Sequence, residues 1–265
     1  MNLESLGFQG FRLCSVRIKI AVNAAAPSAR RESAREGHSM EYQNIIRGTF
    51  LSRPNRFIAM VAIGGQEAVC HVKNTGRCAE LLRPGATVYL EKSANPARKT
   101  AYDLVAVEKG SLLINMDSQA PNRVFAQWAA AGKFLPDVQV IHPEYRYGGS
   151  RLDFALTTPR GLHLVEVKGV TLEENGHARF PDAPTERGIR HLAELEKAVA
   201  EGLEATAFFV IQMEGMEDFA PNDRTHPAFG AALRRAAEHG VRVEAWECAV
   251  TPGTLRIVRP VKVLL

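Results

Sequence analysis

Residues 150–170 decide the fold of the second half of the chain, and they read SRLDFALTTPRGLHLVEVKGV. Residues 158–161 (TPRG) are a favourable turn sequence, with Pro at the second position and Gly at the fourth. Apolar and polar residues alternate on both sides of this turn, which is typical of strands with one buried face. The stretch therefore predicts an antiparallel hairpin, with strands over residues 152–156 and 162–170.

A symmetric hairpin about this turn places Asp153 opposite Glu166 and Arg151 opposite Lys168. Directly opposed side chains on one face of a sheet have Cβ atoms about 4.5–5.5 Å apart. The other face collects the apolar residues Leu152, Phe154, Leu156, Val165 and Val167. One face is thus predicted to be core, while the other gathers two acids and two bases.

Two opposed carboxylates repel each other unless a cation lies between them or one is protonated. Mg²⁺ or Mn²⁺ would satisfy this pair, because both cations prefer oxygen ligands. Asp153 and Glu166 would hold the metal at a scissile phosphate, and Lys168 could orient or deprotonate the attacking water. A salt-bridge ladder on a solvated sheet face fits the same spacing equally well. Spacing alone leaves both interpretations open.

The segments around the hairpin predict an α/β order. Helices are expected over residues 122–131, 185–201 and 227–239, and strands over 141–147, 206–212 and 241–249. The strand after the second helix can join the hairpin in parallel.

Glu144 lies on the strand that enters the site, and is either a further metal-binding acid or an exposed edge-strand residue. Thr185 can cap a helix whose start, with Arg187, could receive a phosphate; a plain solvated helix start is the alternative.

The first half of the chain has a different pattern of short strands. They are expected over residues 45–50, 57–63, 67–72, 87–90 and 102–107. Gly, Pro and Asn residues separate them, and residues 77–82 predict one helical turn. Five short strands with one small helix in some seventy residues indicate a small Greek-key barrel such as an OB-fold.

Basic residues of this first half fall in turns and at strand ends. OB barrels bind nucleic acids through loops and one sheet face, with basic residues along the phosphates. The residues expected to contact nucleic acid are Arg53, Arg56, Lys73, Asn74, Arg77, Arg98 and Lys99, together with Arg187 of the second half. Exposed aromatic residues for base stacking are few, so we expect contacts to the backbone rather than to the bases. Residues 74–76 are also expected to form a tight turn.

The charge distribution agrees with a basic front half. Residues 41–110 contain ten Lys and Arg against six Asp and Glu, whereas residues 111–265 contain 17 against 20. Such a division suits a polyanion-binding N-terminal module, although an ordinary solvated surface can show the same imbalance. Residues 1–39 have no hydrophobic period and predict a disordered extension, with Met40 a candidate natural start. The expected domains are then residues 40–110 and 111–265.

The four cysteines lie far apart, without a CxxC pair, which favours buried thiols in a reducing, cytoplasmic setting. A zinc site at Cys70, His71 and Cys78 lacks a fourth ligand at suitable spacing. No apolar run approaches the ~18–20 residues of a membrane span, so no membrane partner is expected. The oligomeric state is not indicated by the sequence.

Several longer motifs closely resemble one known family. They are RPNRF (53–57), HVKNTGRCAELLRPG (71–85), NPARKTAYDLV (95–105), SRLDF (150–154), VEVKGVTL (165–172) and FPDAPTERG (180–188). Together they resemble the SfsA family, the sugar fermentation stimulation proteins, from Met40 to the C-terminus. Asp153 and the Glu166-Val167-Lys168 run also resemble the PD-(D/E)XK nuclease motif. Two departures are Lys73, where the family usually has Pro, and His226, where an acid is expected.

This resemblance implies an OB-like N-terminal domain followed by a PD-(D/E)XK nuclease-like α/β domain with a mixed sheet. It assigns Asp153, Glu166 and Lys168 to the three motif positions and makes nucleic acid the expected partner. The predicted activity is Mg²⁺- or Mn²⁺-dependent hydrolysis of DNA, with RNA as a further candidate substrate. The alternative is a non-catalytic DNA-binding protein that regulates sugar-utilisation genes.

Overall fold

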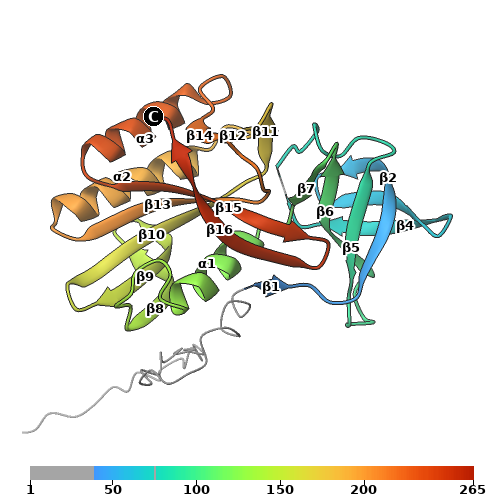
Figure 1. Cartoon of the computed structure of the whole chain (residues 1–265), viewed down its shortest axis with the longest axis horizontal. Coiled ribbons are helices and arrows are strands. Elements are labelled where there is room, and N and C mark those ends of the chain that lie inside the picture. Colours follow the sequence, from blue (N-terminus) through green and yellow to red (C-terminus); the bar gives the residue numbers. More distant parts are fainter. Residues whose placement is uncertain (1–38, 75) are drawn as a thin grey trace, which may run out of the picture.

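The computed structural model describes residues 39–74 and 76–265, which form two domains placed side by side (Figure 1). The extension predicted for residues 1–39 lies, except for its last residue, outside the described residues. Three helices occur in the described part of the chain, namely α1 (Ala120–Ala130), α2 (Glu186–Ala200) and α3 (Pro227–Glu238). All three match helices expected from the sequence, with bounds shifted by one or two residues.

The first domain is the OB barrel that the sequence predicted. Its strands are β2 (Ile45–Asn55), β3 (Ile58–Ile63), β4 (Gln66–Val72), β5 (Thr87–Lys92), β6 (Tyr102–Lys109) and β7 (Leu112–Asn115). Neighbours pair in the order β4-β3-β2-β5-β6-β7, and a parallel pairing between β4 and β6 closes the barrel. The helical turn expected over residues 77–82 is present as one turn, in which the amide N–H groups of Leu81 and Leu82 both donate to the Cys78 carbonyl.

The barrel sheet continues past residue 110, where we expected the domain boundary. Strand β7 pairs antiparallel with β6, so that Ile114 lies opposite Val107 and is fully buried. The sequence pattern did not separate β7 from the linker, because this strand is only four residues long. The first domain therefore includes residues up to Asn115 in its hydrogen-bonded sheet.

The second domain is a mixed-sheet α/β domain, as expected. Its strands are β8 (Val140–Tyr147), β9 (Ser150–Thr158), β10 (Gly161–Val170), β11 (Leu172–Glu174), β12 (His177–Phe180), β13 (Glu204–Ile211), β14 (Asp218–Pro221), β15 (Arg242–Thr251) and β16 (Thr254–Val263). The sheet order is β11-β12-β14-β16-β15-β13-β10-β9-β8. Strand β1 (Met40–Glu41) pairs with β16, so the start of the described chain joins the sheet of the second domain.

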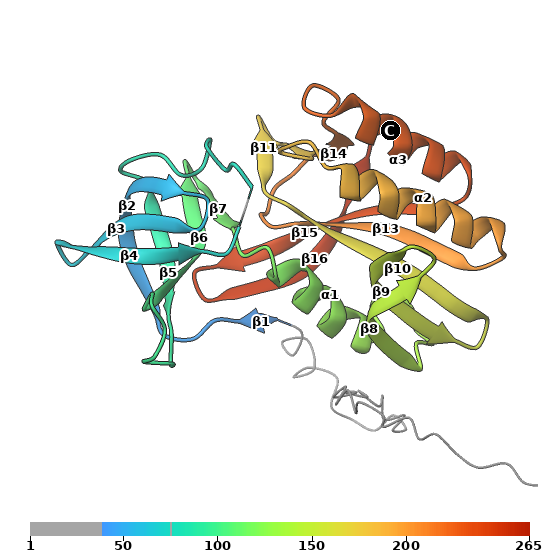
Figure 2. The ribbon, with the colours of Figure 1, turned by 180° about the vertical axis from the view of Figure 1, so that it is seen from behind.

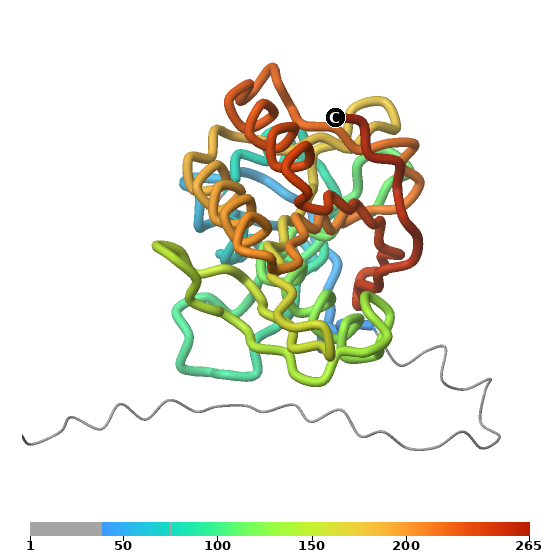
Figure 3. The backbone as a smooth tube through the Cα atoms, turned by 90° about the vertical axis from the view of Figure 1, so that its left-hand side faces the viewer, coloured from blue at the N-terminus to red at the C-terminus, as the bar shows by residue number. Residues whose placement is uncertain are grey.

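Helices cover both faces of this sheet. Alternate residues of β13 point to opposite sides: Phe209 packs in the cluster that includes Leu192 of α2 and Leu233 of α3, and Phe208 packs in the cluster that includes Phe125 of α1. Figure 2 shows α1 against the sheet beside the barrel, and Figure 3 shows α2 and α3 lying next to each other. Because both faces are covered, the central strand β13 is almost entirely apolar and buried after its first residue.

The β9–β10 hairpin, which lies toward the β8 edge of the sheet, has the predicted register. Ala155 pairs with Leu164, and Phe154 pairs with Val165, around the two-residue connection between β9 and β10. Strand β13 then joins β10 in parallel after the α2 crossover, as the order of elements indicated. This register fixes which residues of β9 and β10 share the face toward α2.

The domain junction is tied to the end of β10 by hydrogen bonds. The side-chain amide of Gln212, directly after β13, donates to Oδ1 of Asn115 at 2.8 Å and to the carbonyl of Asp117 at 3.1 Å. The backbone N–H of Gln212 donates to the carbonyl of Val170 at 2.9 Å. Two residues before Val170 is Lys168, so the junction and the candidate site are neighbours along β10.

Two smaller expectations concern cysteines and membrane spans. Cys70, Cys78 and Cys248 are buried free thiols, as predicted, and burial raises the pKa of Cys70 to about 11. The fourth cysteine, Cys14, lies outside the described residues. None of the helices in the described ranges is long and apolar enough to cross a membrane.

Candidate active site

Asp153, Glu166 and Lys168 gather where β9 and β10 run side by side. The ammonium of Lys168 contacts Oε1 of Glu166, and the backbone N–H of Asp153 donates to Oε2 of Glu166 at 3.4 Å. Glu166 is buried, with 2% of its surface exposed, whereas Asp153 and Lys168 are half-buried. The structure thus brings together the three residues that the sequence singled out.

Asp153 is held by groups on two other parts of the domain. Its Oδ1 accepts a hydrogen bond of 2.8 Å from the side-chain amide of Asn122 in the first turn of α1, and its Oδ2 accepts one of 2.9 Å from the backbone N–H of Val167. Burial, followed by the nearby Glu166 carboxylate, raises the pKa of Asp153 above its ordinary value. The environment therefore disfavours the charged form unless a cation is present.

Glu166 has the opposite electrostatic character. Burial alone would raise its pKa, but contacts with His191 and Lys168 outweigh this effect and lower it. His191 lies on α2, is itself buried, and directs Nδ1 at Oε1 of Glu166. The pKa values of two carboxylates on adjacent strands, one buried and one half-buried, are thus shifted in opposite directions, which is a frequent property of functional sites.

Sequence reasoning did not find Asn122 and His191 as site residues. The signal for His191 was weak: it is a histidine on the buried stripe of α2, among Gly188, Leu192 and Leu195. Asn122 is a polar residue in the first turn of α1, where such residues are common for local reasons. Only the packing of the two helices against the sheet shows that both side chains point at the hairpin carboxylates.

Glu144 does not join these contacts. It lies on β8 between Pro143 and Tyr145, which pair with Phe154 and Leu152 of β9, and its backbone adopts a positive φ of 53°. Its carboxylate is 71% exposed and lies 3.6 Å from the guanidinium of Arg151. Of the two interpretations that the sequence allowed, the geometry favours an exposed edge-strand glutamate.

The structure divides the candidate nucleic-acid contacts into two groups. Residues of the first group form hydrogen bonds or ion pairs with other residues of this protein. Arg53 donates to four backbone carbonyls, those of Arg56, Asn74, Gly76 and Arg77, at 2.7–3.0 Å. Lys73 lies 3.1 Å from the buried Asp117 carboxylate, and Arg98 makes a two-pronged contact with Asp103 at 2.6 and 2.8 Å. Asn74 closes a tight turn by accepting from the Gly76 N–H at 2.8 Å. Arg53, Lys73, Arg98 and Asn74 therefore have internal partners.

The second group is exposed and consists of Arg56, Arg77, Lys99 and Arg187. Arg56 stacks over the ring of Phe57, with its guanidinium carbon 4.9 Å from the ring centroid, and 43% of Phe57 is itself exposed. Because Arg53 binds the backbone of both Arg56 and Arg77, it holds these two exposed arginines in one neighbourhood.

The barrel loop of this neighbourhood packs against the loop that precedes α2. A Cβ atom added to Gly76 would lie 2.5 Å from Oδ2 of Asp182, so the Asp182 side chain closely approaches the Gly76 backbone. Thr185 caps α2 as predicted, accepting a hydrogen bond of 3.1 Å from the Gly188 N–H. The exposed barrel arginines and the start of α2 are thereby brought to the same side of the molecule.

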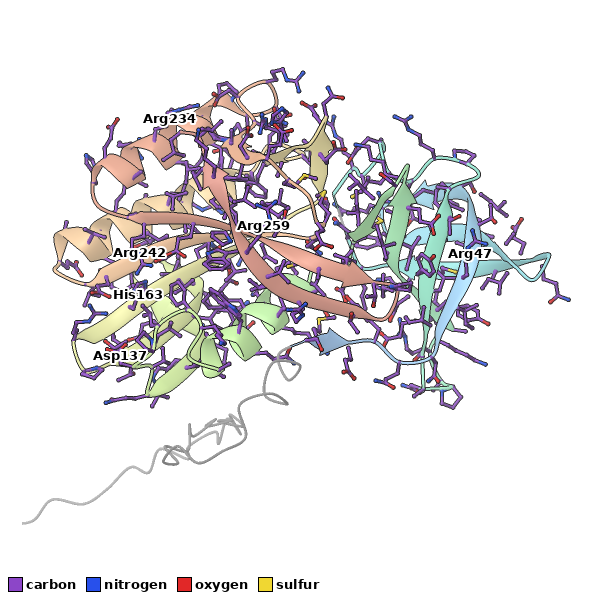
Figure 4. The ribbon with its side chains drawn as sticks, in the orientation of Figure 1. Arg47, Asp137, His163, Arg234, Arg242 and Arg259 are labelled. Atoms are coloured by element: carbon purple, nitrogen blue, oxygen red, sulfur yellow. The ribbon has the colours of Figure 1, made fainter. Side chains whose placement is uncertain are left out.

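Two observations limit where a metal could bind in the described part of the chain. Among residues 39–74 and 76–265, no three His, Cys, Asp or Glu side chains form a group that could hold a metal by themselves. The buried His163, labelled in Figure 4, is bonded to Glu204 and Thr206 at 2.9 and 2.8 Å and belongs to the core. The pair Asp153 and Glu166 fits a cation such as Mg²⁺, which typically takes one or two carboxylates and keeps several waters.

The fold and the site define a class: proteins in which an OB barrel precedes a mixed-sheet α/β domain with a paired-carboxylate and lysine cluster. Residues 51–116 match the family model described as "SfsA N-terminal OB domain", and residues 119–254 match the one described as "Sugar fermentation stimulation protein RE domain". The chain belongs to the sugar fermentation stimulation protein (SfsA) family.

Individual relatives cover almost all of the described chain. A "Sugar fermentation stimulation protein homolog" of Clostridium beijerinckii is 51% identical over 226 residues, which are 85% of this chain and 100% of the relative. A homolog of the same description from Desulfitobacterium hafniense is 55% identical over 216 residues, or 82% and 94% of the two chains. A solved structure described as "The structure of Pyrococcus Furiosus SfsA in complex with Ca2+" has a TM-score of 0.78 and 29% identity, covering 85% of this chain and 98% of that one.

Proposed function

We propose that this protein is a metal-dependent nuclease that hydrolyses phosphodiester bonds of DNA, with RNA as a further candidate substrate. The observation that carries the proposal is the convergence of Asp153, Glu166 and Lys168 on one face of the β9–β10 hairpin. A protein that only binds DNA has no need for a buried and a half-buried carboxylate beside a lysine. Removing such a cluster of charges from water costs folding free energy. Its presence is therefore better explained by a function than by stability.

Asp153 and Glu166 would hold Mg²⁺ or Mn²⁺. The raised pKa of Asp153 supports this assignment, because a bound cation offsets both its burial and the repulsion from Glu166. The related structure described with Ca²⁺ supports it further, since Ca²⁺ also prefers oxygen ligands. When bound, the metal would polarise the phosphate and make water a better nucleophile at neutral pH.

The other groups of the site have distinct tasks. Lys168 places a positive charge at the edge of the cluster, where it can hold the attacking water or offset charge on the phosphate. Asn122 and the Val167 N–H fix the orientation of the Asp153 carboxylate. The hydrogen bond from Asn122 also ties α1, and with it the domain junction, to the site.

The barrel would position the nucleic acid through its exposed basic residues. Among the described residues, the side chains of Arg56, Arg77 and Lys99 make no hydrogen bond or ion pair with another residue, and Phe57 offers one face for a base. The predicted contacts with internal partners would instead affect binding indirectly, by fixing the shape of the barrel loops; these are Arg53, Lys73, Asn74 and Arg98. Binding is therefore expected to be dominated by phosphate contacts and to weaken with rising salt.

The test is a cleavage assay with labelled single- and double-stranded DNA and RNA in Mg²⁺, Mn²⁺ or EDTA. Wild type is compared with Lys168→Ala and with Lys133→Ala, an exposed lysine elsewhere in the same domain. Loss of a proton-transfer or charge-stabilising group typically lowers the rate by about 10²–10⁴-fold. We expect that loss for Lys168→Ala, no change for Lys133→Ala, and no cleavage in EDTA.

Equal cleavage by wild type and Lys168→Ala would show a contaminating nuclease and remove the proposal. Salt-sensitive DNA binding without any metal-dependent cleavage would instead favour the alternative, a non-catalytic DNA-binding protein that regulates sugar-utilisation genes. Circular dichroism of each variant distinguishes loss of chemistry from loss of the fold.

A further inference from the structure

His191 occupies a position directly against one of the two site carboxylates. Only 4% of its surface is exposed, and Nδ1 of its ring contacts Oε1 of Glu166. The ring belongs to α2, whose buried side packs on β9, β10 and β13. Glu166 is therefore held by a helix that lies outside the hairpin as well as by Lys168 and the Asp153 N–H within it.

A second contact determines which nitrogen of this ring carries the proton. Nε of Arg187, one helical turn earlier on α2, donates to Nε2 of His191 at 3.2 Å. Arginine is always protonated and has no acceptor, so Nε2 must offer its lone pair. The neutral ring then carries its proton on Nδ1, where it donates to Glu166. Arg187 thus selects the tautomer that holds the carboxylate.

Arg187 keeps part of its guanidinium available. The contact with His191 uses Nε only, the side chain is exposed, and among the described residues no carboxylate forms an ion pair with it. The two terminal NH₂ groups of a guanidinium match two oxygens of a phosphate. A phosphodiester bound there would fix the same side chain that orders His191.

The other carboxylate is held independently of α2. Asp153 is bonded to Asn122 of α1 and to the Val167 N–H of β10. A change in Arg187 or His191 is therefore expected to disturb Glu166 while the hydrogen bonds of Asp153 persist. The orientation of Asp153 therefore depends on α1 and β10, whereas that of Glu166 also depends on α2.

We propose that His191 is a positioning residue for Glu166, and that Arg187 couples the binding of a phosphodiester to the binding of the metal. The proposal rests on the metal-dependent nuclease function stated above. A substrate phosphate bound to Arg187 would hold its side chain against Nε2 of His191 and so stabilise the Nδ1–H tautomer. That tautomer in turn fixes the orientation of the Glu166 carboxylate, which would hold the cation. Because such coupling is reciprocal, metal and phosphodiester should each tighten the binding of the other.

The first test measures Mn²⁺ binding to the intact protein by calorimetry, without nucleic acid. His191→Leu removes the donor to Glu166, whereas the amide nitrogen of His191→Asn lies where Nδ1 was and can still donate. Groups that orient a metal ligand typically change metal affinity by about 10–100-fold when removed. We expect that loss for His191→Leu and nearly wild-type affinity for His191→Asn. A merely structural role for His191 would not be rescued by asparagine in this way.

The second test repeats the titration with dimethyl phosphate as a phosphodiester probe. We expect the probe to tighten Mn²⁺ binding to wild type by about five-fold or more. The effect should vanish in Arg187→Ala and in His191→Asn, which has lost the acceptor for Arg187. Arg190→Ala, an exposed arginine on the same helix, serves as the matched control and should keep the coupling.

A third measurement is independent of the metal. Long-range ¹H–¹⁵N NMR of the histidine rings should show His191 as the Nδ1–H tautomer in wild type. An Nε2–H tautomer, or unchanged Mn²⁺ affinity in His191→Leu, overturns the inference while leaving the nuclease function intact if wild type still cleaves. If wild type neither binds Mn²⁺ nor cleaves, the proposed function fails and the inference fails with it.

Discussion

Asn122 and Asp153, which lie on a helix and a strand far apart in sequence, are joined by a hydrogen bond of 2.8 Å from the Asn122 amide to Oδ1 of Asp153. This bond leaves the carboxylate little freedom to rotate, since its other oxygen accepts from the Val167 N–H. Removing it should loosen one metal ligand without changing the charge of the site.

Asn122→Ala is therefore expected to weaken Mn²⁺-dependent cleavage by about 10-fold or more. The fold should survive, because Asn122 is half-buried in the first turn of α1 and is not part of the apolar core. Calorimetric Mn²⁺ affinity and the cleavage rate provide the measurement. Gln127→Ala, an exposed change on the same helix, is the control; equal rates for the two variants would contradict the role given to Asn122.

Arg53 and Arg56 allow the two groups of basic barrel residues to be separated. Arg53→Ala leaves four backbone carbonyls without their donor and should destabilise the protein by about 1–3 kcal/mol. Arg56→Ala removes an exposed charge and should leave stability unchanged while reducing the salt dependence of DNA binding. Urea unfolding and binding assays at several salt concentrations distinguish the two effects. A stability loss in Arg56→Ala equal to that in Arg53→Ala would show that this division is wrong.

The hairpin could be predicted because its determinants are local. A two-residue connection between complementary alternating strands leaves one favourable register, and the structure has that register from Gly161 to Val165. Barrel strands β2 to β6 were found for the same reason, whereas the short strand β7 was not. Strand β16 was not predicted, although Leu255 and Ile257 alternate with polar residues; the pattern is interrupted at Pro260, a residue that is unfavourable within a sheet.

The partners of the site residues could not be predicted in the same way. Lys73 is bonded to Asp117, 44 residues later, and a sequence cannot tell such a lysine from one that meets a phosphate. His191 reaches Glu166 only because α2 crosses back over the sheet. Local patterns thus gave the carboxylates, whereas the groups that orient them depend on tertiary packing.

Gly169, next to Lys168, should not tolerate a side chain. An added Cβ would lie 2.4 Å from Oε1 of Gln212 and 2.7 Å from Cγ of Pro121, closer than packed atoms allow. Gly169→Ala must therefore displace the junction or the end of β10. We expect the free energy of unfolding to fall by about 1–3 kcal/mol, and the cleavage activity to fall as well. Gly253→Ala, whose Cβ would meet no atom nearer than 3.9 Å, is the matched control in thermal unfolding. Equal melting temperatures for the two variants would contradict this tight packing.

Asp103 should make the stability of the protein depend on pH in the acid range. The carboxylate is buried, which by itself would raise its pKa, but hydrogen bonds from Arg98 and His71 and the charge of Lys73 lower the pKa below its ordinary value of 3.8. A carboxyl group with a lower pKa in the folded state stabilises the protein above its unfolded-state pKa. That stabilisation is lost as the pH falls through the folded-state pKa.

Asp103→Asn removes this contribution, so the variant should be less stable than wild type at pH 7 by about 1–3 kcal/mol. The difference between the two proteins should shrink as the pH falls below about 4, because wild type then loses the same charge. Urea unfolding between pH 7 and pH 3 measures it. Glu67→Gln, an exposed carboxyl group of the same barrel, should follow wild type at every pH. A gap between wild type and Asp103→Asn that stays constant down to pH 3 would show that the buried ion pairs of Asp103 do not stabilise the barrel through its charge.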